Sequence, residues 1–233
     1  MRIENVLGDG IGFIELVDHM GSDLTVANSA RVSFGKRKEA LDDTDIKLIR
    51  YLAKHKHWSP FRHVSFQFHV KAPEVVARQW FKHIVGAEYA FKDSPWNEIS
   101  GRYIVYPEEF YIPTALRKQS DNNKQASTDE PVNYHEDTLN KFKNGIRAQY
   151  NLYKELLDAG VCKEQARLVL PFSTYTEFYW SPSLQAAVNF IKLRKAGGAQ
   201  KETSWFANAM ETLLTPYVPH SMEALMGVAD ANS

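Results

Sequence analysis

Residues 63–80 read HVSFQFHVKAPEVVARQW, and this stretch predicts a strand followed directly by a helix. Over residues 63–71, apolar and polar side chains alternate, which is the period of a strand with one buried face. Pro73 fits the first turn of the following helix, because its missing N–H would have had no partner there. The apolar pattern continues toward His83, so Gln79 is expected near the end of that helix.

The other segments predict a chain in which helices dominate. Stretches rich in alternating, aromatic or β-branched residues predict two further strands, at residues 12–18 and 174–180. Apolar residues that recur every three or four positions predict helices at residues 24–32, 43–53, 139–157, 164–170, 184–195 and 199–215. A polar run predicts a long mobile loop over residues 113–131. The expected fold class is α+β, with a central mixed or antiparallel sheet and long helices.

The composition predicts a single soluble domain over residues 1–233. A chain of 233 residues with 44% hydrophobic content can bury one large core. Lys+Arg and Asp+Glu both total 28, so the zero formal net charge gives no basic footprint for nucleic acid. No apolar run approaches the roughly 20 residues of a membrane span, and residues 1–5 lack the apolar core of a secretory signal. We therefore expect a cytoplasmic protein that binds neither nucleic acid nor membrane.

A second stretch, NEISGRY at residues 97–103, has the residue types that bind an anion. Glycine allows backbone N–H groups close to a phosphate, the Ser100 hydroxyl can donate to it, and Arg102 can supply two parallel charge-assisted hydrogen bonds. Arg167 and Arg194 are two more basic centres, both within helical sequence. Two alternatives stay open: residues 97–103 form an ordinary surface turn, and the two helical arginines form interhelical salt bridges.

The histidines and the single cysteine do not form a pattern typical of a metal site. His55 and His57 lie at a helix end, whereas His63 and His69 alternate within the predicted strand, and this spacing matches no zinc motif. Cys162 excludes an internal disulfide and a cysteine-rich zinc site, and it fits a reducing compartment. We interpret the cysteine as a small buried residue, and we expect no metal.

Seven segments resemble the flavin-dependent thymidylate synthases, and together they cover nearly the whole chain. They include ARVSF, HWSPFRH, NEISGRY, FYIP and EQARLVLP, and their positions are residues 30–34, 57–63, 68–81, 97–103, 110–113, 164–171 and 189–200. Their order and separations follow the family, apart from one insertion. Seven ordered segments are far harder to match by chance than one short motif.

The resemblance implies a homotetramer whose active sites lie between subunits. Each site would bind FAD, dUMP, methylenetetrahydrofolate and NADPH, and the product would be dTMP. In this family NADPH reduces the flavin, the folate delivers its one-carbon unit to C5 of the uracil ring, and a hydride from the flavin completes the methyl group. The family uses no cysteine nucleophile, which agrees with the single cysteine of this chain.

The resemblance also implies roles for individual residues. The dUMP-binding residues would be Gln79, Lys82, Glu98, Ser100, Gly101, Arg102, Arg167 and Arg194. The FAD-binding residues would be Ser33, Ser59, Lys82, His83, Ile84, Glu98, Ser183, Gln185 and Asn189. Arg194 and His57 are the catalytic candidates. Arg194 would face the uracil, where a guanidinium stabilises the negative charge that develops as N3 loses its proton, and His57 would line the flavin's site.

The chain departs from the commonest family pattern where FAD is expected. Residues 82–84 read Lys-His-Ile in place of Arg-His-Arg, and the segment 85–96 is longer than usual. Ser183, Gln185 and Gly198 stand where the family has asparagine, arginine and histidine. Two classes therefore stay open: an active flavin-dependent methyltransferase, and a catalytically silent nucleotide-binding flavoprotein relative. The retained uracil-facing arginine favours the first.

Overall fold

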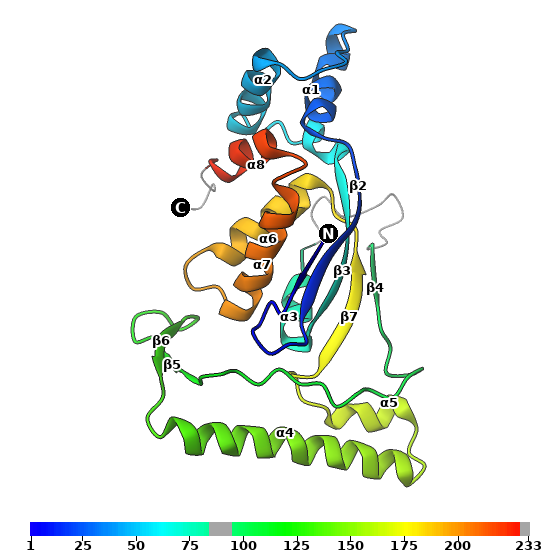
Figure 1. The fold of residues 1–233 in the computed structure, drawn as a ribbon, viewed down its shortest axis with the longest axis vertical. Coiled ribbons are helices and arrows are strands. Elements are labelled where there is room, and N and C mark those ends of the chain that lie inside the picture. The colour runs from blue at the N-terminus through cyan, green and yellow to red at the C-terminus, as the bar shows by residue number, and fades with distance from the viewer. Residues whose placement is uncertain (84–94, 229–233) are drawn as a thin grey trace.

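The computed structural model describes residues 1–83 and 95–228, and its centre is a five-stranded sheet (Figure 1). The strand order is β1-β2-β3-β7-β4. These strands span Arg2–Glu4 (β1), Phe13–Met20 (β2), Ser65–Pro73 (β3), Trp96–Glu98 (β4) and Tyr175–Trp180 (β7). Every neighbouring pair is antiparallel, so the described part of the chain has the antiparallel form of the expected α+β class.

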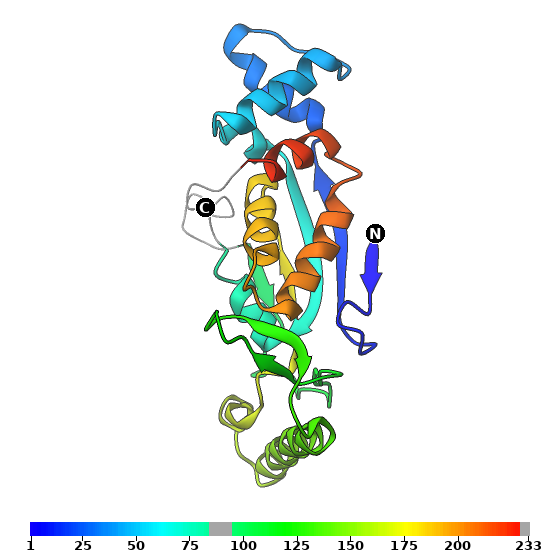
Figure 2. The same ribbon diagram turned by 90° about the vertical axis from the view of Figure 1, so that its left-hand side faces the viewer.

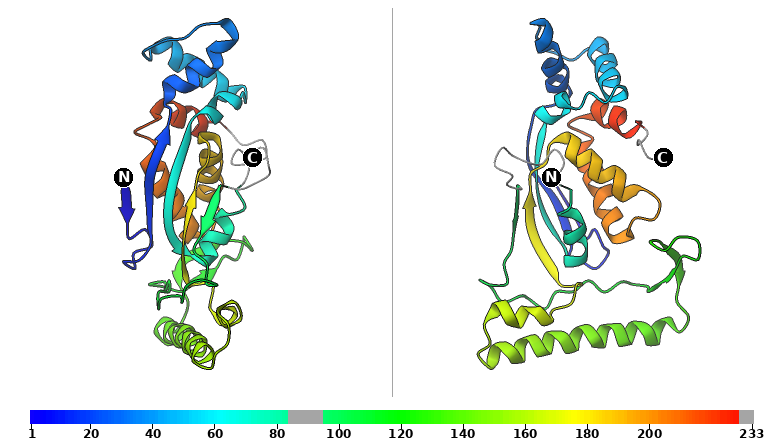
Figure 3. Two further views of the ribbon diagram at one scale, coloured as in Figure 1. Left: turned by 90° about the vertical axis from the view of Figure 1, so that its right-hand side faces the viewer. Right: turned by 180° about the vertical axis from the view of Figure 1, so that it is seen from behind.

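Helices cover one face of this sheet and lie at both of its ends. The α-helices span Asp23–Arg31 (α1), Asp43–Lys54 (α2), Glu74–Trp80 (α3), His135–Asp158 (α4), Lys163–Ala166 (α5), Leu184–Lys195 (α6), Lys201–Leu214 (α7) and Pro219–Met226 (α8). Three short 3-10 helices span Val32–Phe34 (η1), Ser59–His63 (η2) and Arg167–Val169 (η3). Helices α6 and α7 lie on one face of the sheet (Figure 2). Helices α1, α2 and α8 lie at one end of the molecule, and α4 and α5 at the other (Figure 3).

Strand β3 is central and confirms the alternating pattern over residues 65–71, whereas His63, predicted within the strand, is the last residue of η2. Val64, Phe66, Phe68 and Val70 are each at most 2% exposed, because they point toward the covering helices. The polar residues between them lie on the opposite face of the sheet, where they are partly or fully exposed. The hydrophobic period therefore fixes which face of the strand enters the core.

Helix α3 is held to the sheet by Trp80, which is fully buried. Its indole stacks on Phe190 of α6 with ring centroids 4.3 Å apart, and it meets Phe178 of β7 edge-on at 5.4 Å. Trp180 and Phe206 complete the aromatic cluster at 5.7 and 6.0 Å. One side chain thus joins α3 to the sheet and to both covering helices.

The structure corrects the predicted start of α3. Pro73 pairs with Tyr175 across the sheet, and its backbone is extended, with φ −64° and ψ 150°. The proline is therefore the last residue of β3 and the N-cap residue of α3, and the first helical residue is Glu74. The helix ends at Trp80, before His83. A tight turn follows it, in which the His83 N–H donates to the Trp80 carbonyl at 2.9 Å.

Residues 113–131, predicted as one long mobile loop, include regular secondary structure. The segment contains a hairpin, whose strands span Arg117–Gln119 (β5) and Ser127–Pro131 (β6). Arg117 Nε donates to Ser127 Oγ at 3.0 Å, and Arg117 Nη2 donates to the buried Glu202 of α7 at 2.8 Å. The hairpin is polar on both faces, so it lacks the hydrophobic alternation that predicts a strand.

The predicted helices at residues 24–32, 43–53, 139–157 and 184–195 are confirmed as α1, α2, α4 and α6. The short strands β1 and β4 and the last helix, α8, were not predicted from the sequence. Helix α8 is anchored by the buried Asp23, whose carboxylate accepts hydrogen bonds from the backbone N–H groups of His220 and Ser221, both at 2.9 Å. Within residues 1–83 and 95–228, none of the helices combines the length and apolarity needed to cross a membrane.

We predict that Trp80→Ala lowers the free energy of unfolding by about 3–5 kcal/mol, because it removes a large buried ring and leaves a cavity. Trp80→Phe is the matched control. It keeps an aromatic ring in the cluster and removes an indole N–H that has no hydrogen-bond partner in the described part of the chain, so it should cost less than Trp80→Ala. Urea denaturation measures both values. Equal losses would show that the cluster does not hold α3.

Candidate active site

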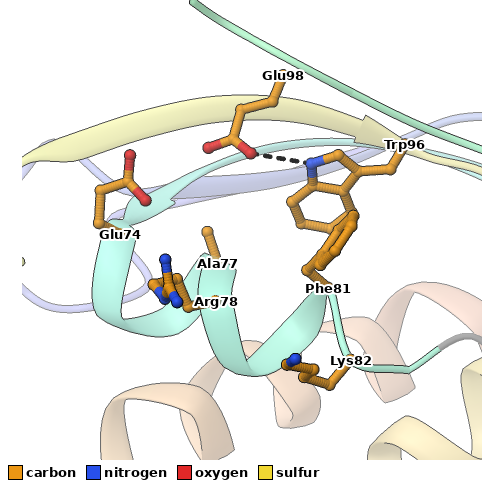
Figure 4. A pocket seen from close by; sticks show the side chains of 7 residues that line it. All are labelled: Glu74, Ala77, Arg78, Phe81, Lys82, Trp96 and Glu98. Atoms are coloured by element: carbon orange, nitrogen blue, oxygen red, sulfur yellow. Dashed lines mark hydrogen bonds between the residues drawn. The ribbon is translucent and has the colours of Figure 1, made fainter. Parts of the chain in front are cut away.

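Two of the pockets beside helix α3 share the side chains of Glu74 and Arg78. The first has a volume of about 320 Å³ and lies between α3 and β4. Its lining residues are Glu74, Ala77, Arg78, Phe81, Lys82, Trp96 and Glu98 (Figure 4). The second, of about 410 Å³, extends along η3 and includes Arg167 and Tyr106. Charged side chains from three separate segments therefore surround one region.

Glu98 is placed in the first pocket by strand β4. This strand pairs with β7, and Thr176 of β7 donates its hydroxyl to Glu98 Oε1 at 2.6 Å. Trp96 Nε1 donates to Glu98 Oε2 at 2.9 Å (Figure 4). Two side-chain donors fix the carboxylate. The first two residues of 97–103 belong to the sheet, whereas residues 100–103 form the surface turn that stayed open as an alternative, in which the Tyr103 N–H donates to the Ser100 carbonyl at 2.9 Å.

Gly101 brings the loop after β4 against Arg167. A Cβ atom at Gly101 would lie 2.3 Å from the ring of Tyr106 and 3.2 Å from Arg167 Cδ, so only glycine fits this position. Tyr106 is itself fixed, because its backbone N–H donates to the hydroxyl of Tyr153 and its carbonyl accepts from the hydroxyl of Tyr150, both at 3.2 Å. Gly101 and Arg167, both expected to bind dUMP, therefore lie close together within one chain.

The arginines around these pockets are not neutralised by ion pairs. The Arg78 guanidinium lies 5.8 Å from the ring centroid of Phe172, and that of Arg102 lies 5.4 Å from the ring of Tyr103. Arg167 has no hydrogen-bonded or ion-paired carboxylate among the described residues. The interhelical salt bridge that stayed open for Arg167 is thus absent from the described part of the chain, and these cations are available to an anion.

A separate cluster surrounds Arg194 at the C-terminal end of α6. Arg194 Nε donates to Nε2 of His83 at 3.0 Å, and its two Nη atoms donate to the side-chain and backbone oxygens of Gln79 at 3.3 and 3.1 Å. Gln79 also hydrogen-bonds Gln200. Within residues 1–83 and 95–228, Arg194 has no carboxylate partner either, so its expected alternative role in a salt bridge is not observed.

Burial sets the charge state of this second cluster. It lowers the pKa of His83 to about 4, and the nearby Arg194 charge contributes to this shift. His83 is therefore neutral at pH 7, and its Nε2 can accept the hydrogen bond from Arg194. Burial also lowers the pKa of Arg194, because it removes water from the guanidinium, and a negative charge beside this cation would offset that loss of solvation.

The residues expected to bind dUMP fall into two groups on adjoining faces of α3. Glu98 and Arg167 line the pockets that Glu74 and Arg78 share, and Gly101 lies against Arg167. Ser100 and Arg102 flank Gly101 but line neither pocket, and Arg102 is exposed. Gln79 and Arg194 form the second group, with His83. Lys82 lines the first pocket, just beyond the end of α3 (Figure 4).

The residues expected to bind FAD lie mainly near η2 and α6. Ser59 opens η2, and Ser183 is the N-cap residue of α6, where its hydroxyl accepts from the N–H of Ala186 at 3.3 Å. Gln185 is buried and accepts from Nε of Arg62 at 2.6 Å. Asn189, Ser33 and His57 are exposed on α6, in η1 and between α2 and η2, respectively. Ile84 and most of the insertion at 85–96 lie outside the described residues.

The structure explains why this chain has glycine at position 198, where histidine is common in the family. Its φ of +91° favours glycine, and a Cβ atom there would lie 2.8 Å from Nδ2 of Asn123 in the polar hairpin. The hairpin thus occupies the space that a side chain at this position would need.

The remaining candidates do not gather at either cluster. Cys162 is exposed, contrary to the expected burial. The rings of His55 and His57 are 6.3 Å apart, whereas Nε2 of His69 lies 2.6 Å from Glu177 on the strand face. In the part of the chain that the structure describes, no three His, Cys, Asp or Glu side chains are grouped as metal ligands.

Glu74 is a site residue that was not predicted from the sequence. Burial raises the pKa of this carboxyl to about 7, Glu98 adds to the shift, and Arg78 and Arg167 oppose it. A signal was present in the sequence. Glu74 follows Pro73 at the start of the predicted helix, and it lies one turn before Arg78 on the same helix face.

Comparison with known proteins identifies the relatives of this chain. The sequence model of the family described as "Thymidylate synthase complementing protein" matches residues 15–220. A flavin-dependent thymidylate synthase of Thermus thermophilus is 45% identical over 208 residues, which cover 89% of this chain and 73% of the relative. The enzyme of that name from Thermosipho africanus is 40% identical, with coverage of 94% and 92%.

A solved structure gives the same result. The UMP/dUMP methylase PolB from Streptomyces cacaoi, bound with 5-Br dUMP, superposes with a TM-score of 0.80 at 32% sequence identity. The match covers 93% of this chain and 95% of the PolB chain.

We predict that the His83 imidazole titrates far below the ordinary histidine range, near pH 4, in an NMR titration of the labelled side chain. Arg194→Met should raise this pKa part of the way toward the ordinary value of 6.5, because it removes the neighbouring charge while most of the burial remains. A pKa near 6.5 in the unmodified protein would contradict the buried position of His83.

Proposed function

The chain belongs to the family of flavin-dependent thymidylate synthases, and from this membership we propose that it converts dUMP to dTMP. Methylenetetrahydrofolate would donate the carbon, and NADPH would reduce the bound FAD. One observation carries the proposal. Arg167 and Arg194 occupy positions that the family resemblance assigns to dUMP, and neither guanidinium is paired with a carboxylate among the described residues.

Binding of dUMP would use both groups of residues around α3. The phosphate would lie against Arg167 and the loop that carries Ser100 and Arg102, since these groups combine hydroxyl and guanidinium donors with the close backbone approach that Gly101 allows. Glu98 would hold the sugar and cofactor in register from the fixed position that its two donors give it.

The uracil ring would lie against Arg194. Its guanidinium is oriented by Gln79 and by the neutral His83, so little reorganisation is needed when a ligand arrives. Because the arginine is partly desolvated, its charge acts more strongly on a neighbouring group than it would in water. It would stabilise the ring as N3 loses its proton and C5 becomes nucleophilic.

The residues near η2 and α6 fit FAD, although they differ from the common family pattern. Ser59, Lys82, His83 and Asn189 would hold the cofactor, and the exposed Arg62 beside Gln185 provides a guanidinium near the position where the family has arginine. His57 and Ser33 would contribute from the neighbouring end of the fold. FAD supplies the hydride that completes the methyl group.

We propose that four copies assemble with active sites shared between them, as the family resemblance implies, and, from the composition, that they do so in the cytoplasm. The separation of the dUMP residues into two groups on adjoining faces of α3 supports a shared site. Large apolar side chains are also exposed on η1, η3 and the loop after β4, and Val32, Phe34, Leu168 and Tyr103 are each more than two-thirds exposed.

The alternative, a catalytically silent nucleotide-binding flavoprotein relative, has one observation in its favour. Ser183 and Gln185 are both buried, and each accepts an internal hydrogen bond, so neither side chain is presented at the surface as a family donor to FAD would be. A silent relative would bind dUMP and FAD without forming dTMP.

We predict that the purified protein is yellow or binds added FAD, and that NADPH bleaches this colour faster when dUMP is present. Addition of methylenetetrahydrofolate should then produce dTMP, which chromatography detects. Absorbance at the flavin bands follows the bleaching. A colourless protein without affinity for FAD would exclude the proposed reaction, and FAD binding without dTMP would support the silent relative.

We also predict that Arg194→Ala slows methyl transfer by at least about 100-fold, because it removes charge stabilisation where negative charge develops. FAD binding should stay within about threefold, since Arg194 is assigned to the uracil. Arg50→Ala is the control, as this exposed arginine pairs with Glu223 on a distant surface. Unchanged turnover in Arg194→Ala would remove the residue from the mechanism.

A further inference from the structure

Glu74 places a carboxyl group at the centre of the site, and the proposed reaction assigns this group no role. It is the first residue of α3, and its backbone N–H donates to the carbonyl of Thr174 at 2.9 Å. Its side chain lines both pockets beside α3. The carboxylate accepts no hydrogen bond from any residue that the structure describes, so no donor holds it in its ionised form.

Charged or titratable groups from several segments surround Glu74. Arg78 comes from α3 itself, Glu98 from β4, Arg167 from η3, and the neutral phenol of Tyr106 from the loop after β4. Lys82, just beyond the end of α3, lines the same pocket. Three of these groups are cations and one is a carboxylate. The region around Glu74 therefore carries net positive charge, and the ionisation state of Glu74 decides how much of it is left for an anionic ligand.

Glu74 is close to half ionised at neutral pH. Burial is the largest cause of its raised pKa of about 7, and the Glu98 carboxylate is the second. Arg78 and Arg167 act in the opposite direction but do not overcome burial. A small change in local charge therefore changes the protonation of Glu74 in the physiological range.

A phosphate group would make that change. The phosphate of a nucleoside monophosphate carries about two negative charges above its second pKa of about 6. Next to Arg167 it would lie in the same region as the Glu74 carboxylate, and the two like charges would repel each other across a partly desolvated pocket. The repulsion disappears when Glu74 takes up a proton.

We propose that Glu74 couples binding of the nucleotide phosphate to the uptake of one proton, so that the neutral carboxyl is the state that admits the phosphate. Glu74 is thus a positioning residue that tunes the affinity for dUMP without entering the methyl transfer. The inference rests on the proposed function, because it takes dUMP as the ligand.

The sign of the pH dependence follows from this coupling. Below pH 7 most of Glu74 is already protonated and binding costs little further proton uptake. Above pH 7 the carboxylate must be protonated before the phosphate enters, so dUMP binding weakens as the pH rises. If only the protonated form binds, the apparent Kd rises roughly 15-fold between about pH 7 and about pH 8.5.

Calorimetry tests the coupling directly. The FAD-loaded protein is titrated with dUMP at about pH 7.5 in two buffers that differ in their heat of ionisation, which gives the number of protons taken up. We expect more than half a proton for the unmodified protein, since about three-quarters of a group with a pKa near 7 is ionised at that pH. The dUMP phosphate contributes almost nothing there, because its own pKa is about 6.

Glu74→Gln should take up almost no proton, and its Kd should stay constant between about pH 7 and pH 8.5, with about 30-fold tighter binding than the unmodified protein at the upper end. Glu74→Ala is a second neutral variant in case the amide disturbs α3. Glu223→Gln is the matched control, because this glutamate is exposed and pairs with Arg50 far from the pocket. It should behave like the unmodified protein.

Two outcomes overturn the inference alone: dUMP binds without proton uptake, or both neutral variants take up as many protons as the unmodified protein. If dUMP does not bind to the FAD-loaded protein at any pH between about 6 and 8.5, the proposed function itself fails. A merely structural role for Glu74 would change affinity at all pH values equally and would leave the proton count unchanged.

Discussion

The burial of Trp80 is the constraint on which both halves of the proposed site depend. Helix α3 has only 7 residues, so it has little stability of its own and takes its position from this side chain. With Trp80 fixed among rings from β7, α6 and α7, one face of α3 presents Glu74 and Arg78 to β4 and η3. The adjoining face presents Gln79 to Arg194. A shift of this helix would therefore disturb the phosphate side and the uracil side together.

Electrostatics divides the site into two regions with different tasks. Around Arg78 and Arg167, the cations outnumber the carboxylates, and this imbalance favours an incoming anion. Around Arg194, the partner is a neutral imidazole instead of a carboxylate, so the guanidinium is oriented without being neutralised. The first region would hold charge that dUMP already carries, and the second would stabilise charge that appears only during the reaction.

The sequence predicts the elements whose apolar period is strong and misses those whose position depends on tertiary pairing. The alternation over residues 63–71 identifies β3, and helix α6 is predicted to the residue. Strand β4 has only 3 residues and exists because it pairs with β7, which no local pattern reveals. In the site, residue types and family resemblance identify Arg167 and Arg194 as binding candidates. The helical spacing of Glu74 and Arg78 can be read from the sequence, but the raised pKa of Glu74 cannot, because it arises from burial and from Glu98, which the fold brings close.

The guanidinium groups beside α3 are proposed to hold the phosphate of a pyrimidine nucleotide, and this is the central claim. A crystal structure of the protein with dUMP and FAD bound measures it most directly. We predict a phosphorus position within hydrogen-bonding reach of Arg167 and of the loop at Gly101, with the uracil ring against Arg194 from the same or a neighbouring copy. A nucleotide bound elsewhere, with Arg78 and Arg167 paired to carboxylates or facing solvent, would contradict the claim.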